Sequence, residues 1–240
     1  MRDALESDGF AVVRGVLSAD EIRRVRASFD RLLHIARTGG DPGTASFVMQ
    51  RDPFRLDRVV WCGGADPWLD ALGRDPRFVR LAAEALDSRE LVQIIGQAHF
   101  KLPGDGVDFD WHQDASNRRY GSALWTDVDG RGSFIEIAMA VDPMGPANGG
   151  LRMIPGTHRL GFVADPDTGE LPDGLVEPDR AVDPELEPGD VVLFGPFVIH
   201  GSPPNRSSVP RRLLLQGYAL PGANRRVYPG CGTGVRRTVR

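Results

Sequence analysis

The stretch Trp111-His112-Gln113-Asp114 places a histidine and an aspartate two residues apart. In a β-strand, residues i and i+2 point to the same face, so this imidazole and this carboxylate would converge on one point. A third candidate, His200, lies far downstream. Two histidines and one carboxylate are the ligand set that holds non-haem Fe(II) on one face and leaves the opposite positions open. The spacing therefore predicts a catalytic metal centre formed by His112, Asp114 and His200.

His200 follows the run Val191–Ile199, which is nearly continuous in apolar residues and begins after the turn 188–190. Such a run is typical of a buried core strand. We therefore expect one strand over about 190–200, with His200 at its end and at the mouth of a barrel. A histidine that only caps the strand end through a backbone hydrogen bond is the alternative.

From residue 90 onward, short β-type runs alternate with turns rich in Gly, Pro and Asn, as expected of a sandwich or barrel. We expect strands at about 91–101, 108–114, 133–142, 150–154, 190–200 and 211–219. The prediction is a mainly β fold.

Gly9–Val16 is expected to form a short strand, and two helices are expected before residue 90. Ser18 and Glu21 form a capping box, and apolar residues then recur at helical spacing over about 18–36. Asp75-Pro76 opens the second helix. No interdomain linker is visible. We therefore predict a single domain over 1–240, with a helical part at about 1–89 packed on the outside of a barrel at about 90–220.

Composition excludes several classes of partner. The chain has 240 residues and a net charge of −4, so no broad basic surface would attract nucleic acid. No run of ~18 apolar residues suggests a membrane span. Two cysteines are too few for a disulfide framework, which favours a reducing cytoplasm. A small-molecule substrate is the expected partner, and the sequence leaves the oligomeric state undetermined.

Two adjacent arginines open the last predicted strand, and strand alternation separates them. Arg211 shares its face with Leu213 and Leu215, whereas Arg212 points to the other side. A guanidinium on an apolar inward face is costly unless it is paired, and a carboxylate is its natural bidentate partner. Arg211 could therefore bind a ligand carboxylate or form a salt bridge with an acidic residue distant in sequence.

The strand at 91–101 also alternates. Gln93, Gln97, His99 and Lys101 are expected on one face, which would be either solvent-exposed or the wall of a polar cavity. Lys101 is the only lysine in the chain. If the face lines a cavity, Gln97 and Lys101 can offer hydrogen-bond donors to an anionic ligand.

Taken in order, these pieces resemble the phytanoyl-CoA dioxygenase family of Fe(II)/2-oxoglutarate oxygenases. The matching stretches run almost from end to end: Gly9-Phe10, 101–104 leading to 111–114, 148–159, 188–190, and His200 through Ser202 to Arg211. The ordered set is highly specific.

The resemblance implies a double-stranded β-helix, a jelly-roll barrel with the metal at its open end. It also implies Fe(II) bound by His112, Asp114 and His200, with the C5 carboxylate of 2-oxoglutarate held by Ser202 and Arg211. O2 would be the co-substrate, and succinate and CO2 would be released.

Hydroxylation of an unactivated C–H bond is the reaction that this resemblance favours. Ring closure, epimerisation and desaturation by the same cofactors remain alternatives. Halogenation is disfavoured, because halogenases of this class lack the carboxylate that Asp114 supplies. A cupin-type metal isomerase without 2-oxoglutarate would leave Ser202 and Arg211 unexplained, and a metal-free binding module would leave the three ligands unexplained.

The substrate is not readable from the sequence. Loops at a barrel mouth usually carry specificity. The candidates to contact it therefore come from the segment 47–61 and from the loop after the metal ligands; they are Phe47, Met49, Arg51, Arg118, Tyr120 and Trp125. The Arg-rich, Lys-poor composition suggests a GC-rich bacterium, and from this we expect a natural-product intermediate; a small acid or amine is the second candidate.

Overall fold

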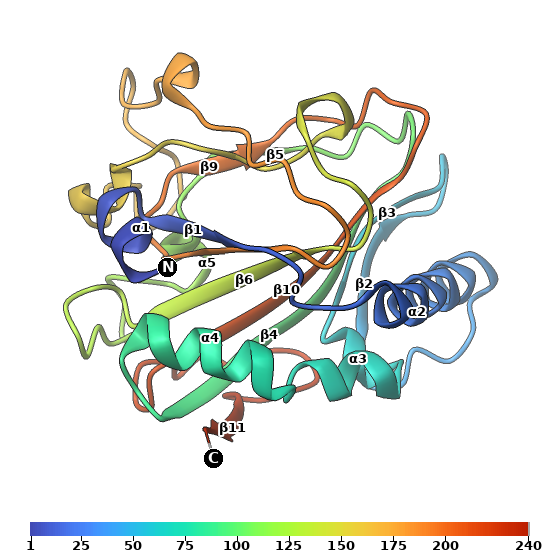
Figure 1. Ribbon diagram of the computed structural model, residues 1–240, viewed down its shortest axis with the longest axis horizontal. Helices are drawn as coiled ribbons and strands as arrows, with labels where there is room; N and C mark the ends of the chain where they lie inside the picture. Colours follow the sequence, from blue (N-terminus) through green and yellow to red (C-terminus); the bar gives the residue numbers. More distant parts are fainter. Residues whose placement is uncertain (240) are drawn as a thin grey trace.

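Two antiparallel β-sheets form the body of the protein, in a computed structural model that describes residues 1–239. From one edge to the other, the larger sheet contains β1 (Phe10–Val13), β8 (Val191–Phe194), β6 (Phe134–Ala140), β10 (Arg211–Ala219), β4 (Glu90–Lys101), β3 (Arg55–Val60) and β2 (Ser46–Gln50), with β11 (Val235–Thr238) paired to β4. The smaller sheet contains β5 (Phe109–His112), β9 (His200–Ser202) and β7 (Arg152–Met153). In Figure 1 the small sheet lies over the large one. This is the mainly β jelly-roll architecture expected from the sequence.

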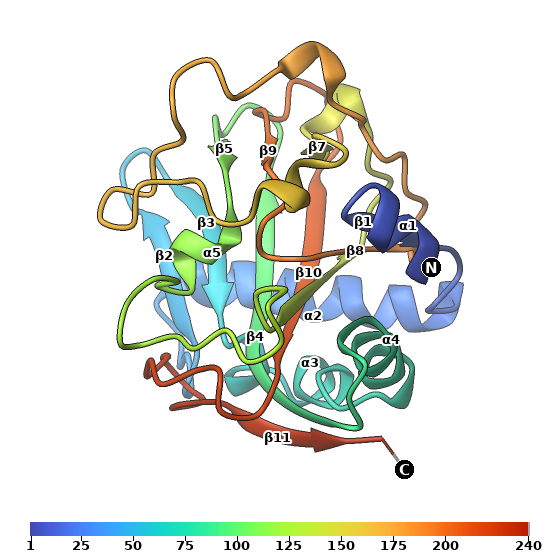
Figure 2. The same cartoon turned by 90° about the vertical axis from the view of Figure 1, so that its left-hand side faces the viewer.

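Three helices cover the outer face of the large sheet (Figure 1): α2 (Ala19–Thr38), α3 (Pro67–Leu72) and α4 (Pro76–Leu86). The capping box predicted at the start of α2 is present, because Ser18 accepts a hydrogen bond from the Glu21 backbone and Glu21 bonds back to Ser18. The helices α3 and α4 both begin with an Asp N-cap followed by Pro, which fixes their first turns. In Figure 2 the short helices α1 (Arg2–Ser7) and α5 (Asp114–Asn117) lie outside this layer.

Strand alternation divides the core into two clusters. On β10, Leu214 and Tyr218 join the cluster that packs against the helices, whereas Leu213 and Leu215 join the cluster inside the barrel. The same alternation on β6 sends Ile135 to the helices and Phe134 to the interior. Alternate residues of each strand therefore point into the space between the sheets, and only these side chains can reach a site there.

The apolar run 190–200 is two strands, and the expectation of one continuous strand is wrong. β8 ends at Phe194 in the large sheet, and His200 opens β9 in the small sheet. Gly195 and Pro196 lie between them, and a proline has no N–H to donate to a ladder. The chain therefore crosses from one sheet to the other, and His200 enters the site as the first residue of a strand.

The first 89 residues contribute strands as well as helices. β1 forms one edge of the large sheet, and β2 and β3 extend the other edge. β11 adds to β4 beyond the expected end of the barrel at about 220. The expected boundary near residue 89 therefore does not separate helices from sheet.

Among residues 1–239, no helix combines the length and the apolar character that crossing a membrane requires.

Candidate metal centre and cofactor site

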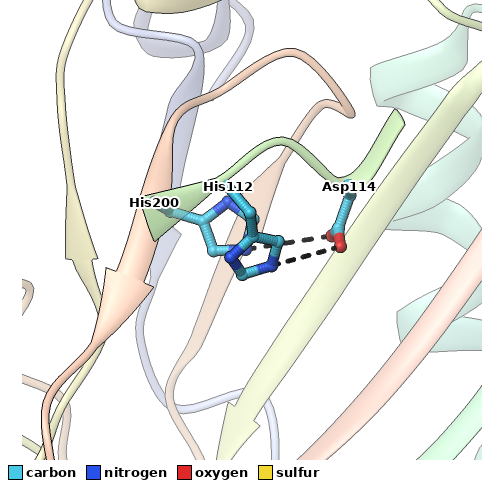
Figure 3. A group of neighbouring side chains, drawn as sticks. All are labelled: His112, Asp114 and His200. Atoms are coloured by element: carbon cyan, nitrogen blue, oxygen red, sulfur yellow. Dashed lines mark ion pairs between the residues drawn. The ribbon is translucent and has the colours of Figure 1, made fainter. Parts of the chain in front are cut away.

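Three side chains converge between the two sheets (Figure 3). His112 ends β5, His200 begins β9, and these two residues pair across the small sheet. The Nε2 of His112 lies 3.7 Å from Asp114 Oδ1, and the Nε2 of His200 lies 4.0 Å from Asp114 Oδ2. One ligand atom from each residue lies within 4.8 Å of the others. A single metal ion could contact all three atoms, in the two-histidine, one-carboxylate arrangement.

The convergence depends on the backbone between the first two ligands. β5 ends at His112, two residues earlier than expected, and Asp114 begins α5. Gln113 between them keeps an extended conformation, with φ −111° and ψ 132°. The side chains at 112 and 114 therefore point the same way, as the sequence predicted, although only one of them belongs to the strand.

The buried side chain of Gln113 fixes this backbone. Its amide donates to the carbonyl oxygens of Gly161 (2.8 Å) and Phe197 (2.7 Å), and its Oε1 accepts from the backbone of Val163 (2.9 Å) and Ala164 (3.3 Å). All four bonds go to segments remote in sequence. The glutamine between the ligands therefore ties them to the loops around the site.

Both histidines present a free Nε2 lone pair to the centre. The Nδ1 of His112 lies 2.7 Å from the carbonyl oxygen of Asp110, and the Nδ1 of His200 lies 3.0 Å from that of Val198. Because a carbonyl oxygen only accepts, each Nδ1 must carry the proton. Burial, and then the neighbouring His112, lower the pKa of His200 to about 4, so the ring is neutral near pH 7. This is the state that a metal requires.

A buried acid supports the third ligand. Glu136, on β6, forms a hydrogen bond with Asp114. Burial and the adjacent Asp114 raise the pKa of Glu136 well above its ordinary value. Although burial alone would raise it, the pKa of Asp114 is lowered, because Glu136 and the two histidines favour its charged form. The donor set is therefore two imidazoles and one carboxylate, which fits Fe(II).

Two buried basic side chains, those of Lys101 and Arg211, lie in the same cavity. Arg211 donates through Nε and Nη2 to the carbonyl oxygen of Gly149, at 3.0 and 2.9 Å. The Nζ of Lys101 donates to Ser202 Oγ at 2.6 Å and to the carbonyl oxygens of Ser202 and Pro203, both at 2.7 Å. The side chains of Lys101 and Arg211 are 0% and 1% exposed. Within residues 1–239 neither forms a salt bridge, and two buried basic groups without a carboxylate indicate a site for an external anion.

We call Lys101 and Arg211, together with Ser202, the cradle. The pKa values of its two basic groups support that conclusion. Burial, and then the charge of Arg211, lower the pKa of Lys101 to about 6. Burial lowers the pKa of Arg211 to about 10. An anion placed between them would favour the charged form of both groups.

Arg212 shows the opposite environment. It points to the helix side of the sheet, where its Nε lies 2.8 Å from Asp142 and its Nη1 lies 2.7 Å from Asp30. The division of Arg211 and Arg212 between the two faces, predicted from alternation, is confirmed.

The metal group and the cationic cradle share one cavity of about 940 Å³. His112, Asp114, His200, Ser202 and Arg211 all line it. Lys101 reaches it through its bonds to Ser202. The cavity is large enough for a dicarboxylate of the size of 2-oxoglutarate together with a second small molecule.

Comparison with known families identifies the chain. The family model described as phytanoyl-CoA dioxygenase (PhyH) matches residues 5–213. The chain belongs to this family. It is thus a non-haem Fe(II)/2-oxoglutarate-dependent oxygenase, as the resemblance implied.

Characterised relatives act on small molecules. A probable alpha-ketoglutarate-dependent hypophosphite dioxygenase from Stutzerimonas stutzeri is 32% identical over 68% of this chain and 56% of its own length. The L-proline trans-4-hydroxylase of Streptomyces griseoviridis is 26% identical over 88% of this chain and 82% of its own. The chain thus spans little more than half the length of the first relative and most of the second.

A solved structure supports the cofactor assignment. EvdO2 from Micromonospora carbonacea, crystallised in complex with 2-oxoglutarate, superimposes with a TM-score of 0.71 and 28% identity. The superposition covers 94% of this PhyH-family chain and 92% of EvdO2. The barrel and the cofactor chemistry are therefore shared with a protein that holds 2-oxoglutarate.

The remaining sequence-predicted cofactor residue, Gln97, also lines the cavity. Its Oε1 lies 2.9 Å from the Nε2 of His99, a buried histidine that lines the same wall. The amide nitrogen of Gln97 stays available as a donor, and its contact with a cofactor stays a prediction.

Gln93 departs from the expected face. A β-bulge between β10 and β4, where the register shifts at Gly217/Tyr218, rotates β4 at this point. Gln93 therefore turns to the helix side, where its Nε2 donates to Gln216 at 2.7 Å. Gln97, His99 and Lys101 keep the expected inward direction.

Of the expected substrate residues, Arg118 alone lies among the residues that line the cavity within 1–239. Phe47 and Met49 pack against the core beneath the helices, because the other residues of β2, Ser46 and Val48, face the cavity. Arg51 lies exposed in the turn after β2.

Tyr120 and Trp125 have structural contacts away from the cavity. The hydroxyl of Tyr120 donates to Asp127 at 2.9 Å. The indole of Trp125 is buried and donates to the carbonyl oxygen of Gly132 at 3.2 Å. Both side chains thus stabilise the loop after the metal ligands.

The sequence reasoning missed other residues that line the cavity, among them Arg58, Glu136, Arg226 and Tyr228. Glu136 could have been identified from the sequence, because it is the only charged residue in the apolar run of β6. No sequence pattern marks Tyr228 and Arg226, since they lie in an irregular segment after the last expected strand.

Proposed function

We propose that this protein binds Fe(II) through His112, Asp114 and His200, binds 2-oxoglutarate through Arg211, Ser202 and Lys101, and hydroxylates an unactivated C–H bond of a small molecule. Succinate and CO2 are the co-products. The observation that carries this proposal is the pair of buried basic side chains, Lys101 and Arg211, without a carboxylate partner in the same cavity as the three ligands.

The chain's own residues orient the cofactor. Arg211 and Lys101 would hold the C5 carboxylate, and the Oγ of Ser202 lies within hydrogen-bond distance of both. His112, Asp114 and His200 would hold Fe(II) in the same cavity. Bound together, Fe(II) and 2-oxoglutarate supply the oxidising power from O2 that the protein side chains lack.

The rival functions leave parts of the site without a role. A metal isomerase needs no 2-oxoglutarate, so the cradle of Lys101 and Arg211 would hold nothing. A binding module without metal would not need two histidines aimed at a carboxylate. Halogenation is disfavoured because Asp114 occupies the position that a halide would take.

The relatives named for hypophosphite and L-proline support a small-molecule substrate. A natural-product intermediate stays the prediction of the sequence for this chain. A cytoplasmic location also stays a prediction, and the thiols of Cys62 and Cys231 are both free.

Succinate formation is the test. Purified protein with Fe(II), 2-oxoglutarate and O2 should convert 2-oxoglutarate to succinate slowly alone and faster with an accepted substrate, whose product is one oxygen atom heavier. L-proline is the first compound to try. His200→Ala should abolish succinate formation, whereas His34→Ala, an exposed histidine on α2, should not.

Succinate formation that is unchanged in His200→Ala would contradict the metal assignment. A wild-type protein that binds Fe(II) but neither binds nor consumes 2-oxoglutarate would contradict the cofactor assignment and would favour the metal isomerase.

A further inference from the structure

A third buried basic side chain, that of Arg118, lies in the cavity apart from the cradle. Arg118 is 6% exposed and lines the cavity. Its Nη1 donates to the hydroxyl of Tyr228 at 3.3 Å, which is its one side-chain hydrogen bond among the described residues. Its Nε is buried without a partner. No carboxylate within 1–239 forms a salt bridge with it.

Such an environment is costly for a guanidinium. A buried charge is ordinarily paired, and an arginine offers five donors in a fixed fork. Aromatic rings supply part of the compensation, since Phe134 and Tyr228 lie 5.2 and 5.4 Å from the guanidinium carbon. Asp114 and Glu136 are the nearby acids and the charge of Arg118 acts on both, but within residues 1–239 neither forms a salt bridge with it. The donors of Arg118 thus remain available to a ligand.

Arg118 lies on the metal side of the short helix α5. Its backbone N–H donates to the carbonyl oxygen of Asp114 at 3.0 Å, so the two residues are one helical turn apart. Side chains at i and i+4 share a helix face. A group held by Arg118 would therefore lie close to the metal ligand Asp114.

The cradle for 2-oxoglutarate lies at the other end of the sheet. Arg118 stacks on Phe134, which pairs with Ala219 at the end of β10. Arg211 begins the same strand, and the Cα atoms of Arg211 and Ala219 are separated by roughly 26 Å at ~3.3 Å per residue. A C5 carboxylate held by Arg211 would therefore leave Arg118 free for a different group.

We propose that Arg118, assisted by the hydroxyl of Tyr228, binds an oxyanion group of the primary substrate. The substrate is then a small organic anion, such as a carboxylate, whose C–H bond is held near the metal by a contact on the far side from 2-oxoglutarate. This inference rests on the proposed function and adds the substrate class and the residue that selects it.

The test compares an anion with its neutral analogue. Cyclopentanecarboxylate and cyclopentanecarboxamide are titrated anaerobically into protein loaded with Fe(II) and saturated with 2-oxoglutarate, which blocks the cradle. Binding is followed by the visible charge-transfer band of the iron–2-oxoglutarate complex and by ligand NMR. The carboxylate should bind about tenfold or more tightly than the amide, as a charge-assisted contact implies.

Arg118→Gln should abolish this preference while leaving the dissociation constant of 2-oxoglutarate unchanged. Arg80→Gln is the control, since Arg80 is exposed on α4 and is not among the described residues that line the cavity; it should keep the preference. Tyr228→Phe should weaken carboxylate binding a few-fold. Arg118→Lys should keep part of the preference, and it serves as the test if Arg118→Gln does not fold.

No preference for the carboxylate in the wild type would overturn the inference. A preference that survives Arg118→Gln, or that falls equally in Arg80→Gln, would also overturn it. These results differ from a failure of the proposed function, in which the wild type would not bind 2-oxoglutarate at all.

Discussion

The two ends of the cavity are built from different kinds of structure. The cofactor end consists of strand residues, with Lys101 on β4, Ser202 on β9 and Arg211 on β10. The opposite end consists of Arg118 after a four-residue helix and Tyr228 in an irregular segment. Strand alternation fixes the direction of a side chain, whereas an irregular segment does not. On the proposed assignments, the regular part of the barrel holds the cofactor, and irregular segments hold the substrate.

The largest expected effect is at the metal group between these ends. Asp114→Ala or His200→Ala should lower Fe(II) affinity by about 100-fold or more, beyond the cost of changing groups that only orient ligands. Titration of the apoprotein with Fe(II) under anaerobic conditions measures it. His34→Ala is the control, and wild-type affinity in either ligand variant would refute the assignment.

The adjacent arginines should show opposite phenotypes. Arg211→Ala should raise the dissociation constant of 2-oxoglutarate by roughly 30-fold to several thousandfold, because truncating one partner of a buried charged contact costs about 2–5 kcal/mol. Arg212→Ala should leave that constant nearly unchanged. It should instead lower the free energy of unfolding by about 1–3 kcal/mol, since it removes the bonds to Asp142.

Anaerobic titration with 2-oxoglutarate and denaturant unfolding of both variants provide the comparison. Arg211→Lys should recover only part of the affinity, because an ammonium cannot reproduce the guanidinium fork. If Arg212→Ala were the variant that lost 2-oxoglutarate, the face assigned to β10 would be incorrect.

The lowered pKa of Lys101 predicts that the binding of 2-oxoglutarate depends on pH. The pKa of Lys101 without ligand is about 6, far below the ordinary 10.5, because of burial and Arg211. A carboxylate binds the charged amine, so above about pH 6 each binding event takes up a proton. The dissociation constant of 2-oxoglutarate should therefore rise with pH, by up to about tenfold per unit. In Lys101→Met this slope should disappear, and an unchanged slope would contradict the role of Lys101.

The smallest effect is expected at Tyr120, which the sequence placed near the substrate. Its hydroxyl bonds to Asp127 outside the cavity. Tyr120→Phe should therefore change kcat/KM less than about threefold, with a loss of stability of ~1 kcal/mol. Steady-state kinetics with the accepted substrate, beside Tyr228→Phe, would check this. A larger effect at Tyr120 than at Tyr228 would contradict the assignment of Tyr228 to the substrate end of the cavity.

The same comparison explains what the sequence could predict. His112, Asp114 and the division between Arg211 and Arg212 follow from a period of two along extended backbone. The failures arose where that period is interrupted. Gly195 and Pro196 split the apolar run at 190–200 between two sheets, and a bulge turned Gln93 away from the cavity.

The substrate residues failed for a related reason. On β2 a shift of one residue decides whether Phe47 or Val48 faces the cavity, and nothing local in the sequence fixes that register. Tyr228 reaches the cavity through contacts with residues more than a hundred positions away. Such long-range packing leaves no pattern in the sequence around either residue.

Crystallisation under anaerobic conditions with Fe(II) and 2-oxoglutarate tests the central claim most directly. The account predicts metal density among the Nε2 atoms of His112 and His200 and the carboxylate of Asp114. The C5 carboxylate of 2-oxoglutarate should contact Arg211 and Ser202, with Arg118 left free. A metal bound elsewhere, or 2-oxoglutarate with its C5 carboxylate on Arg118, would contradict the assignment of the two ends.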